Sequence, residues 1–215
     1  MRFKSREQAA ELLAERLSAL YKNKNPLILG IPRGAMPMAK IIADGLGGEL
    51  DVVLVHKLGH PDHPELAIGA IDESGATFLS DWASDIDPEY LEAEKARQLS
   101  MLRKRRAQYT PLRAPVDPFD RVVIVVDDGI ATGSTMTAAL RAVRAKKAKE
   151  LVAAVAVASR QAVETLEREC DRVVCLTVPE DFYAVGQFFD DFTQVSDRDV
   201  IEILRRGGVK ISAVG

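Results

Sequence analysis

Short apolar runs separated by helical patterns recur along the first part of the chain. Residues 5–21 place apolar side chains at helical spacing, and Leu27–Ile31 then forms a continuous apolar run. Met36–Leu46 has the pattern of a helix that the following glycine pair ends, and Asp51–His56 is a second apolar run. We therefore predict a helix over 5–21, followed by a strand, helix and strand of the length that a parallel crossover needs.

The same alternation returns in the second half of the chain. Arg121–Val126 and Leu151–Ala158 are apolar runs, and the pattern between them predicts a helix over Thr135–Lys147. A further helix over Gln161–Glu169 and a strand over Arg172–Val178 follow. Because these strands are apolar throughout and do not alternate, they suit a sheet covered on both faces. The predicted fold class is α/β, with an open, mainly parallel sheet and helices on both faces.

Two segments have a different character. Residues 59–119 contain a loop rich in Pro and His and a charged helix from about Pro88 to Gln108, so we predict a helical insertion with a flexible loop. Residues 179–195 are rich in Phe and Asp without a clear period, which is typical of a lid or substrate loop. A chain of 215 residues can form one domain with these additions, with its core at about 25–58 and 120–178.

Composition narrows the class of protein. Hydrophobic residues make up 47% of the chain and charged residues 28%, as in an ordinary globular protein. No apolar run is long enough to cross a membrane, and charges interrupt Met1–Ser18 where a signal peptide would be apolar, so we expect a cytoplasmic protein. Cys170 and Cys175 form no disulfide framework and are interpreted as buried structural thiols.

The charge pattern gives little sign of nucleic-acid binding. The formal net charge is -3, and the basic run Arg103–Arg106 lies on the predicted charged helix. We interpret this run as a solvated helix face, and we expect neither a nucleic-acid nor a membrane partner.

The segment Val122–Thr135 carries the most specific chemistry. Its strand delivers Asp127 and Asp128 to the carboxyl edge of the sheet, where ligands of open α/β folds bind. The chain should then turn through Gly129 and Gly133 into a helix. Backbone N–H groups at the start of that helix form a site for an anion such as a phosphate monoester. Hydroxyl groups join them from Thr132, Ser134 and Thr135.

The two acids decide which phosphate compound fits this site. Paired carboxylates would repel a bare phosphate, so Asp127 and Asp128 more plausibly accept hydrogen bonds from ligand hydroxyls or contact a metal. A diol next to a phosphate describes ribose 5-phosphate. The P-loop signature and the G-x-G-x-x-G signature are both absent. The plain alternative is a helix capped by Thr and Ser beside two strand-end acids, but the ordered set favours a ligand site.

This segment resembles the motif of the type I phosphoribosyltransferase family, an apolar strand, two acidic residues, a spacer and T-G-x-T. The resemblance implies that the two aspartates hold the ribose hydroxyls of 5-phosphoribosyl 1-pyrophosphate (PRPP). It also implies that the loop Ala131–Thr135 holds the 5-phosphate. The matching residues are Asp127, Asp128, Gly129, Ala131, Thr132, Gly133, Ser134 and Thr135.

Two further segments are similar to the same family. Gly30–Ala35 looks like its pyrophosphate loop, in which an unusual backbone conformation turns amides toward the leaving group; an ordinary turn is the alternative. The residues concerned are Pro32, Arg33, Gly34 and Ala35. Lys57 stands where the family places a basic residue before its flexible catalytic loop, so it is a candidate pyrophosphate ligand, and otherwise a solvated lysine.

The segment 179–195 is similar to the hood of some family members, where an aromatic ring stacks on the base. Phe182 or Tyr183 would supply that ring, although aromatic residues in a tail usually pack as core. Asp190 or Asp191 would reach the metal shell, together with the two motif aspartates.

The resemblance implies an Mg²⁺-dependent phosphoribosyltransferase, in which a nitrogen of an acceptor base displaces pyrophosphate from C1 of PRPP. Arg33, Lys57 and Mg²⁺ would neutralise the leaving group, and loop 59–68 would close over the site. Members acting on 6-oxopurines carry an aspartate where this chain has Ala131, which disfavours hypoxanthine or guanine and leaves the acceptor open. A homodimer is the family default. The alternative function is a regulator that senses PRPP or a nucleotide. A phosphatase is a third possibility, but the sequence shows no nucleophile for it.

Overall fold

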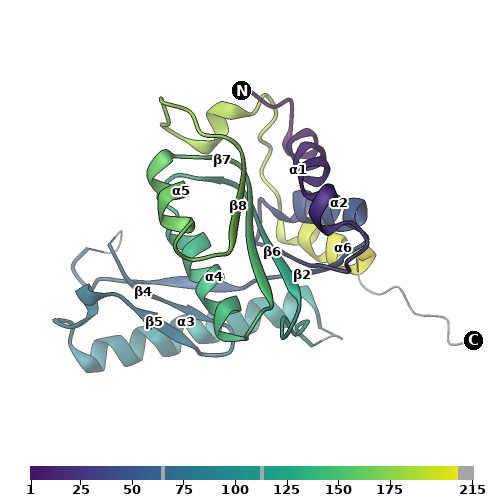
Figure 1. Ribbon diagram of the computed structural model, residues 1–215. Helices are drawn as coiled ribbons and strands as arrows, with labels where there is room; N and C mark the ends of the chain where they lie inside the picture. Colours follow the sequence, from purple (N-terminus) through teal and green to yellow (C-terminus); the bar gives the residue numbers. More distant parts are fainter. Residues whose placement is uncertain (64–65, 112–113, 208–215) are drawn as a thin grey trace, which may run out of the picture.

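A five-stranded parallel sheet forms the centre of the structure (Figure 1), a computed structural model that describes residues 1–63, 66–111 and 114–207. The strand order is β2-β1-β6-β7-β8, and every neighbouring pair is parallel. The predicted α/β class is confirmed. The strands are β1 (Leu27–Gly30), β2 (Glu49–Val52), β6 (Val122–Ile130), β7 (Glu150–Ala158) and β8 (Arg172–Thr177).

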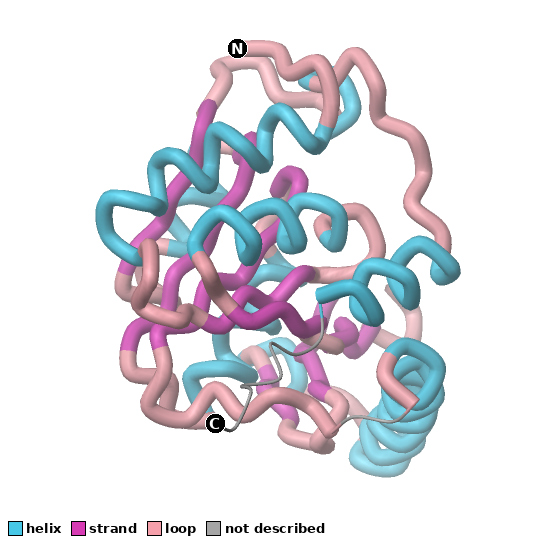
Figure 2. Tube along the Cα trace, turned by 90° about the vertical axis from the view of Figure 1, so that its right-hand side faces the viewer, coloured by secondary structure: helices cyan, strands magenta, loops and turns pink. Residues whose placement is uncertain are grey.

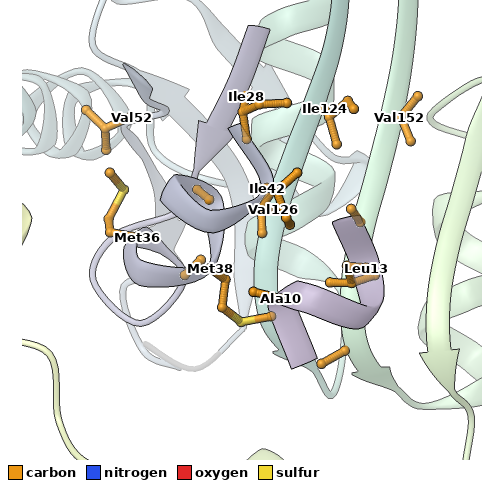
Figure 3. Close-up of a cluster of buried hydrophobic side chains, with 14 of the residues drawn as sticks. Ala10, Leu13, Ile28, Met36, Met38, Ile42, Val52, Ile124, Val126 and Val152 are labelled. Carbon is orange, nitrogen blue, oxygen red and sulfur yellow. The ribbon is translucent and has the colours of Figure 1, made fainter. Parts of the chain in front are cut away.

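Helices cover both faces of this sheet. One face packs against α1 (Arg6–Tyr21), α2 (Met36–Leu46) and α6 (Asp197–Gly207), and the other against α4 (Ser134–Ala145) and α5 (Arg160–Leu166). Alternate strand residues therefore enter two separate cores. Figure 3 shows the core on the α1 and α2 side, where sheet residues meet the two helices. The predicted elements did not include α6.

Helix boundaries follow local signals that the sequence shows. Ser5 caps α1 by accepting a hydrogen bond from the Gln8 backbone N–H. Gly47 ends α2 in the left-handed region, at φ 67°, where glycine pays no steric penalty. Both predicted helices are confirmed, because capping depends on neighbours in sequence only.

The predicted strand Asp51–His56 is wrong, because the chain divides it between two sheets. β2 ends at Val52, and β3 (Val55–Gly59) pairs antiparallel with β4 (Ala67–Asp72), which pairs with β5 (Thr77–Leu79). The Val53 N–H donates to the Gly30 carbonyl, whereas the Leu54 carbonyl accepts from the Glu73 N–H. The chain thus passes from the parallel sheet to the antiparallel sheet between Val53 and Leu54. The predicted insertion 59–119 contains β4, β5 and α3 (Pro88–Tyr109), whereas β3 reaches it only at Gly59.

A largely buried arginine, Arg106, holds α3 against the point where the chain passes between the two sheets. Arg106 donates from Nε to a Glu73 carboxyl oxygen at 2.6 Å and from Nη1 to Asp51 Oδ1 at 2.9 Å. Its Nη2 donates to the Val52 carbonyl at 2.9 Å. The interpretation of Arg103–Arg106 as a solvated face holds for Arg103 but is wrong for Arg106, whose side chain is 12% exposed. Its carboxylate partners lie far away in sequence, so helix periodicity does not reveal the burial.

Gly129 does not lie in the turn that the sequence predicted for it. β6 stays paired with β7 as far as Ile130 and Ala158, so Gly129 lies inside the strand opposite Val157 and not in the turn. A Cβ on Gly129 would stand 2.4 Å from a methyl group of Val185. Glycine therefore lets the short 3₁₀ helix η2 (Val185–Phe188) pack directly on the strand. The turn itself lies at Gly133, where φ is +82°.

The C-terminal segment joins the N-terminus before it reaches α6. Phe3 forms a parallel bridge with Phe189, and the Phe3 N–H donates to the Phe188 carbonyl at 2.8 Å. Figure 2 looks onto the face covered by α1, α2 and α6, and it shows the segment continuing as a long loop to α6. Among the described helices, none has the length and apolar character that a membrane span requires.

Replacing Arg106 tests whether its ion pairs hold the small sheet to the core. Arg106→Gln removes the hydrogen bonds and the charge that Arg106 brings to Asp51 and Glu73, so we expect a loss of about 1.5–3 kcal/mol of unfolding free energy. Urea denaturation measures it. The matched control Arg103→Gln removes an exposed charge from the same helix and should change stability by less than about 0.5 kcal/mol. Equal losses in the two variants would contradict the assignment.

Candidate functional site

The acidic pair Asp127 and Asp128 lies where β6 extends past the neighbouring strand β1. β1 ends at Gly30, opposite Val126, and the Ile31 N–H still donates to the Val126 carbonyl before the chain turns away. β6 continues for four more residues along β7. Asp127 and Asp128 therefore stand at the carboxyl edge of the sheet with no β1 residue beside them, which is where open α/β sheets bind ligands.

Two helices begin beside this acidic pair without a side-chain cap. α2 follows β1 and α4 follows β6, and neither helix has a capping side chain. The other α-helices in the described residues are capped, by Ser5, Asp87, Ser159 and Ser196. Uncapped N–H groups at a helix start favour anions, because the helix dipole adds to their hydrogen-bonding capacity. The capped helices show that this sequence can satisfy such groups elsewhere.

The amides in both turns point to no protein acceptor. Within the described residues, the backbone N–H groups of Arg33–Ala35 donate to no protein atom, and the same holds for Thr132–Thr135. Thr132 Oγ1 lies 3.1 Å from Ser134 Oγ, so two hydroxyls flank the second turn. The peptide bond between Pro32 and Arg33 is cis. The two predicted loops thus each present a row of free donors.

The two aspartates are partly buried, and both pKa values are raised. Burial is the main cause of the strongly raised pKa of Asp127, and the neighbouring charge of Asp128 adds to it. Burial also raises the pKa of Asp128, but Arg6 opposes that rise. Asp127 Oδ1 accepts a hydrogen bond from the Asp128 N–H at 2.9 Å. Both carboxylates therefore cost free energy when they ionise in the ligand-free protein.

Arg6 belongs to the site, although the sequence analysis did not identify it. Its Nε donates to Asp128 Oδ2 at 2.8 Å, and the two side chains are 10% and 13% exposed. One signal in the sequence could have found it. Arg6 is the first residue of α1, where the helix dipole disfavours a positive charge, so a basic residue there suggests a partner outside the helix.

The loop after β1 lies directly against the acidic pair. A Cβ on Gly34 would stand 2.4 Å from Asp128 Oδ2 and 3.3 Å from Nη2 of Arg6. Glycine is therefore required for this close approach. The structure thus brings the predicted pyrophosphate loop, which includes Pro32 and Ala35, to the predicted ribose site.

The two predicted basic ligands lie in different surroundings. Arg33 is 40% exposed, and its Nη1 lies 3.6 Å from Asp197 Oδ2 at the start of α6. Asp197 in turn accepts a hydrogen bond from the Tyr109 hydroxyl. Lys57 lies in β3 opposite Ala70, and it forms no ion pair among the described residues. Part of the predicted closing loop 59–68, residues 64–65, lies outside the described residues.

The predicted hood residues separate into packed and exposed positions. Phe182 packs on Phe188 with ring centroids 5.4 Å apart, whereas Tyr183 is 86% exposed. Asp190 pairs with Arg2 at 2.6 Å, and Asp191 accepts hydrogen bonds from the Thr193 N–H and hydroxyl. Among the described residues, no group of three or more acidic, His or Cys side chains could hold a metal. A metal held here would therefore have at most two such side chains as ligands, and water or substrate oxygens would complete its coordination.

Comparison with known proteins establishes the class. A model of the phosphoribosyl transferase domain family matches residues 4–193, which include both turns, the acidic pair and Arg6. The chain belongs to the phosphoribosyltransferase family. A crystal structure of a Thermus thermophilus protein is 46% identical, covering 97% of this chain and 100% of that one, with a TM-score of 0.89.

A protein of Mycobacterium tuberculosis, provisionally named a phosphoribosyl transferase, is 40% identical over 207 residues. The match covers 95% of this chain but 46% of that protein, so the chain spans about half the length of the curated relatives it matches. A structure of an Aquifex aeolicus protein shares the fold at 13% identity, with a TM-score of 0.51 over 84% of this chain and 76% of that one.

The raised pKa of Asp127 predicts that its charge destabilises the ligand-free protein. Below about pH 4 both folded and unfolded states hold the proton, so there is no penalty; it grows as pH rises through the raised pKa and is complete above it. Asp127→Asn should therefore have a higher unfolding free energy than wild type at pH 7, and the gain should shrink as the pH falls to 4. Denaturant unfolding across this pH range measures the difference.

The matched control for this prediction is Glu164→Gln, which removes a negative charge from an exposed position on α5. It should leave stability nearly unchanged at both pH values. A destabilised Asp127→Asn variant at pH 7 would show that the carboxylate supports the fold instead of opposing it.

Proposed function

We propose that this chain transfers the 5-phosphoribosyl group of PRPP to a nitrogenous acceptor and releases pyrophosphate. Its family membership supports a phosphoribosyltransferase in general terms. The proposal adds the donor, the acceptor class and the roles of individual residues.

One observation carries the proposal: two uncapped helix starts lie at the ends of adjacent parallel strands, with an acidic pair between them. PRPP has the matching pattern, because its ribose diol lies between a 5-phosphate and a pyrophosphate. A ligand with one anionic group would leave one of the two turns unused. A ligand that carried only hydrogen-bond acceptors would offer no donors to the carboxylates of Asp127 and Asp128.

The turn before α4 is the proposed site of the 5-phosphate. Amides of Thr132–Thr135 would donate to its oxygens, and the hydroxyls of Thr132, Ser134 and Thr135 add further donors. Ala131 starts this turn, and its carbonyl already accepts a hydrogen bond from the Ser159 hydroxyl at 2.7 Å. That contact directs the Ala131 carbonyl at Ser159, so it would not face a phosphate bound in the turn.

The acidic pair is the proposed partner of the ribose. Asp127 and Asp128 would accept hydrogen bonds from the diol, as charged acceptors do strongly. Positive charge that develops on the sugar as pyrophosphate leaves would be stabilised by carboxylates that are poorly solvated beforehand. The unfavourable burial of these charges would then contribute to stabilising the transition state.

The turn before α2 is the proposed pyrophosphate site. Its free amides lie at Arg33–Ala35, and Arg33 and Lys57 would supply positive charge. The contact of Arg33 with Asp197 is long and exposed, so pyrophosphate could compete for it at little cost. We further propose that Mg²⁺ arrives with the pyrophosphate and neutralises part of its charge, since Mg²⁺ commonly binds through substrate phosphates.

A PRPP assay tests this proposal. Incubating the protein with PRPP, Mg²⁺ and a panel of bases and amines should release pyrophosphate with at least one acceptor. Asp128→Ala and Lys57→Ala should lower kcat/KM by about 100-fold or more, the scale of a lost transition-state contact. Glu164→Gln serves as the charge-matched control at an exposed site. Tight PRPP binding without turnover would favour the sensing regulator instead, and no binding of PRPP or ribose 5-phosphate would sink the proposal.

The exposed ring of Tyr183 gives a second prediction. If it stacks on the acceptor, Tyr183→Ala should raise the acceptor KM by about 10-fold, the scale of a lost stacking contact, while Tyr183→Phe should retain most of the affinity. Steady-state kinetics with each substrate varied in turn separates the effects. The KM for PRPP should not change. An unchanged acceptor KM in Tyr183→Ala would exclude this ring from the acceptor site.

A further inference from the structure

A guanidinium lies between the acidic pair and the C-terminal segment, where the sequence had suggested a metal bound by both. We infer that Arg6 is the built-in cation of the acidic pair, so that Asp128 serves the ribose without itself binding a divalent metal. The inference rests on the proposed function for the ribose role, but not for the exclusion of metal. Arg6 is thereby a positioning residue that acts through Asp128.

Three separate contacts hold the Arg6 side chain in place. Its Nε donates to Asp128 Oδ2 at 2.8 Å, and its Nη1 donates to the Thr193 carbonyl at 2.7 Å. Its Cζ lies 3.8 Å from the centre of the Phe192 ring, a cation–π arrangement. Only 10% of the side chain is exposed. A planar guanidinium can satisfy all three partners at once, whereas an ammonium group cannot.

The same contacts leave little room for a metal on Asp128. Oδ2 already accepts from Arg6, and Gly34 packs so closely on that oxygen that a Cβ would stand 2.4 Å away. Asp127 Oδ1 accepts from a backbone N–H. A divalent ion bound here would also lie beside a buried positive charge. Mg²⁺ demands near-octahedral oxygen ligands, and Oδ2 of Asp128 could be one of them only if Arg6 moved away.

The acids of the C-terminal segment are likewise engaged by nearby groups. Asp190 pairs with Arg2 at 2.6 Å, and Asp191 accepts from the Thr193 N–H at 3.0 Å and from its hydroxyl at 2.6 Å. Arg6 reaches the backbone of this segment at Thr193 and its ring at Phe192. The arginine therefore makes the connection between acidic pair and C-terminal segment that a shared metal would otherwise make.

An arginine differs from a metal in its effect on the site. Its charge is permanent at physiological pH, and it does not depend on the metal concentration. With Arg6 in place, the acidic pair carries one net negative charge when both aspartates are ionised. Ribose binding should therefore need no divalent ion, and any metal requirement of the reaction should come from the pyrophosphate end alone.

A metal-only experiment tests the exclusion directly. Mn²⁺ is titrated by calorimetry into wild type, Arg6→Gln, Arg6→Gln/Asp128→Asn and the control Arg103→Gln, which removes an exposed arginine on α3. We expect Arg6→Gln to gain a Mn²⁺ site that is at least 10-fold tighter than any site of wild type or Arg103→Gln. The double variant should lose it. Wild-type binding of Mn²⁺ as tight as that of Arg6→Gln, and abolished by Asp128→Asn, would overturn the inference, as would no gain in Arg6→Gln.

A second arm uses ribose 5-phosphate, which lacks the pyrophosphate that carries metal. Wild type should bind it with the same affinity in EDTA and in Mg²⁺, and Arg6→Gln should bind it about 10-fold more weakly in EDTA. Arg6→Lys, which keeps the charge but loses the planar contacts, should fall between them, and circular dichroism confirms that each variant is folded. Metal-dependent binding by wild type would refute the inference. If wild type bound neither ribose 5-phosphate nor PRPP, the proposed function would fail, and the Mn²⁺ titration would still decide the role of Arg6.

Discussion

The parallel pairing of β1 with β6 is the constraint on which the rest of the structure depends. Because both strands run in the same direction, the two turns that follow them lie at one edge of the sheet, and α2 and α4 begin side by side. β6 extends past β1, and its extension carries Asp127 and Asp128 into the space between those turns. One pairing thus places two groups of free amides and one acidic pair within reach of a single ligand.

This arrangement places charge where the protein solvates it poorly. Burial raises the pKa values of both aspartates, so the ligand-free site opposes folding when they ionise. Arg6 offsets part of that cost at Asp128, and it does so from the first turn of α1, where its own charge is unfavourable. Neither end of this contact is optimal for stability alone, which is typical of residues kept for a ligand.

Local patterns predicted most elements but few of the contacts between them. Periodicity, caps and glycine positions predicted the helices α1, α2 and α3 and the parallel strands β1, β6, β7 and β8, and these are confirmed. The strand predicted over Asp51–His56 is wrong because two backbone hydrogen bonds, to Gly30 and from Glu73, pull its halves into different sheets. Arg106 is largely covered by partners from β2 and from the turn after β4, and Gly129 is a strand residue because β6 stays paired with β7 as far as Ile130.

The sequence alone determined the α/β class, most of the strands and helices along the chain, and the segment where the acidic pair is followed by a turn rich in Gly, Thr and Ser, because each depends on residues close together in the chain. The tertiary structure decided what surrounds that pair. Arg6 and Asp128 are 122 positions apart, and Arg6 and Thr193 are 187 positions apart. No local period encodes such contacts, since they exist only when packing brings α1, β6 and the C-terminal segment to the same point.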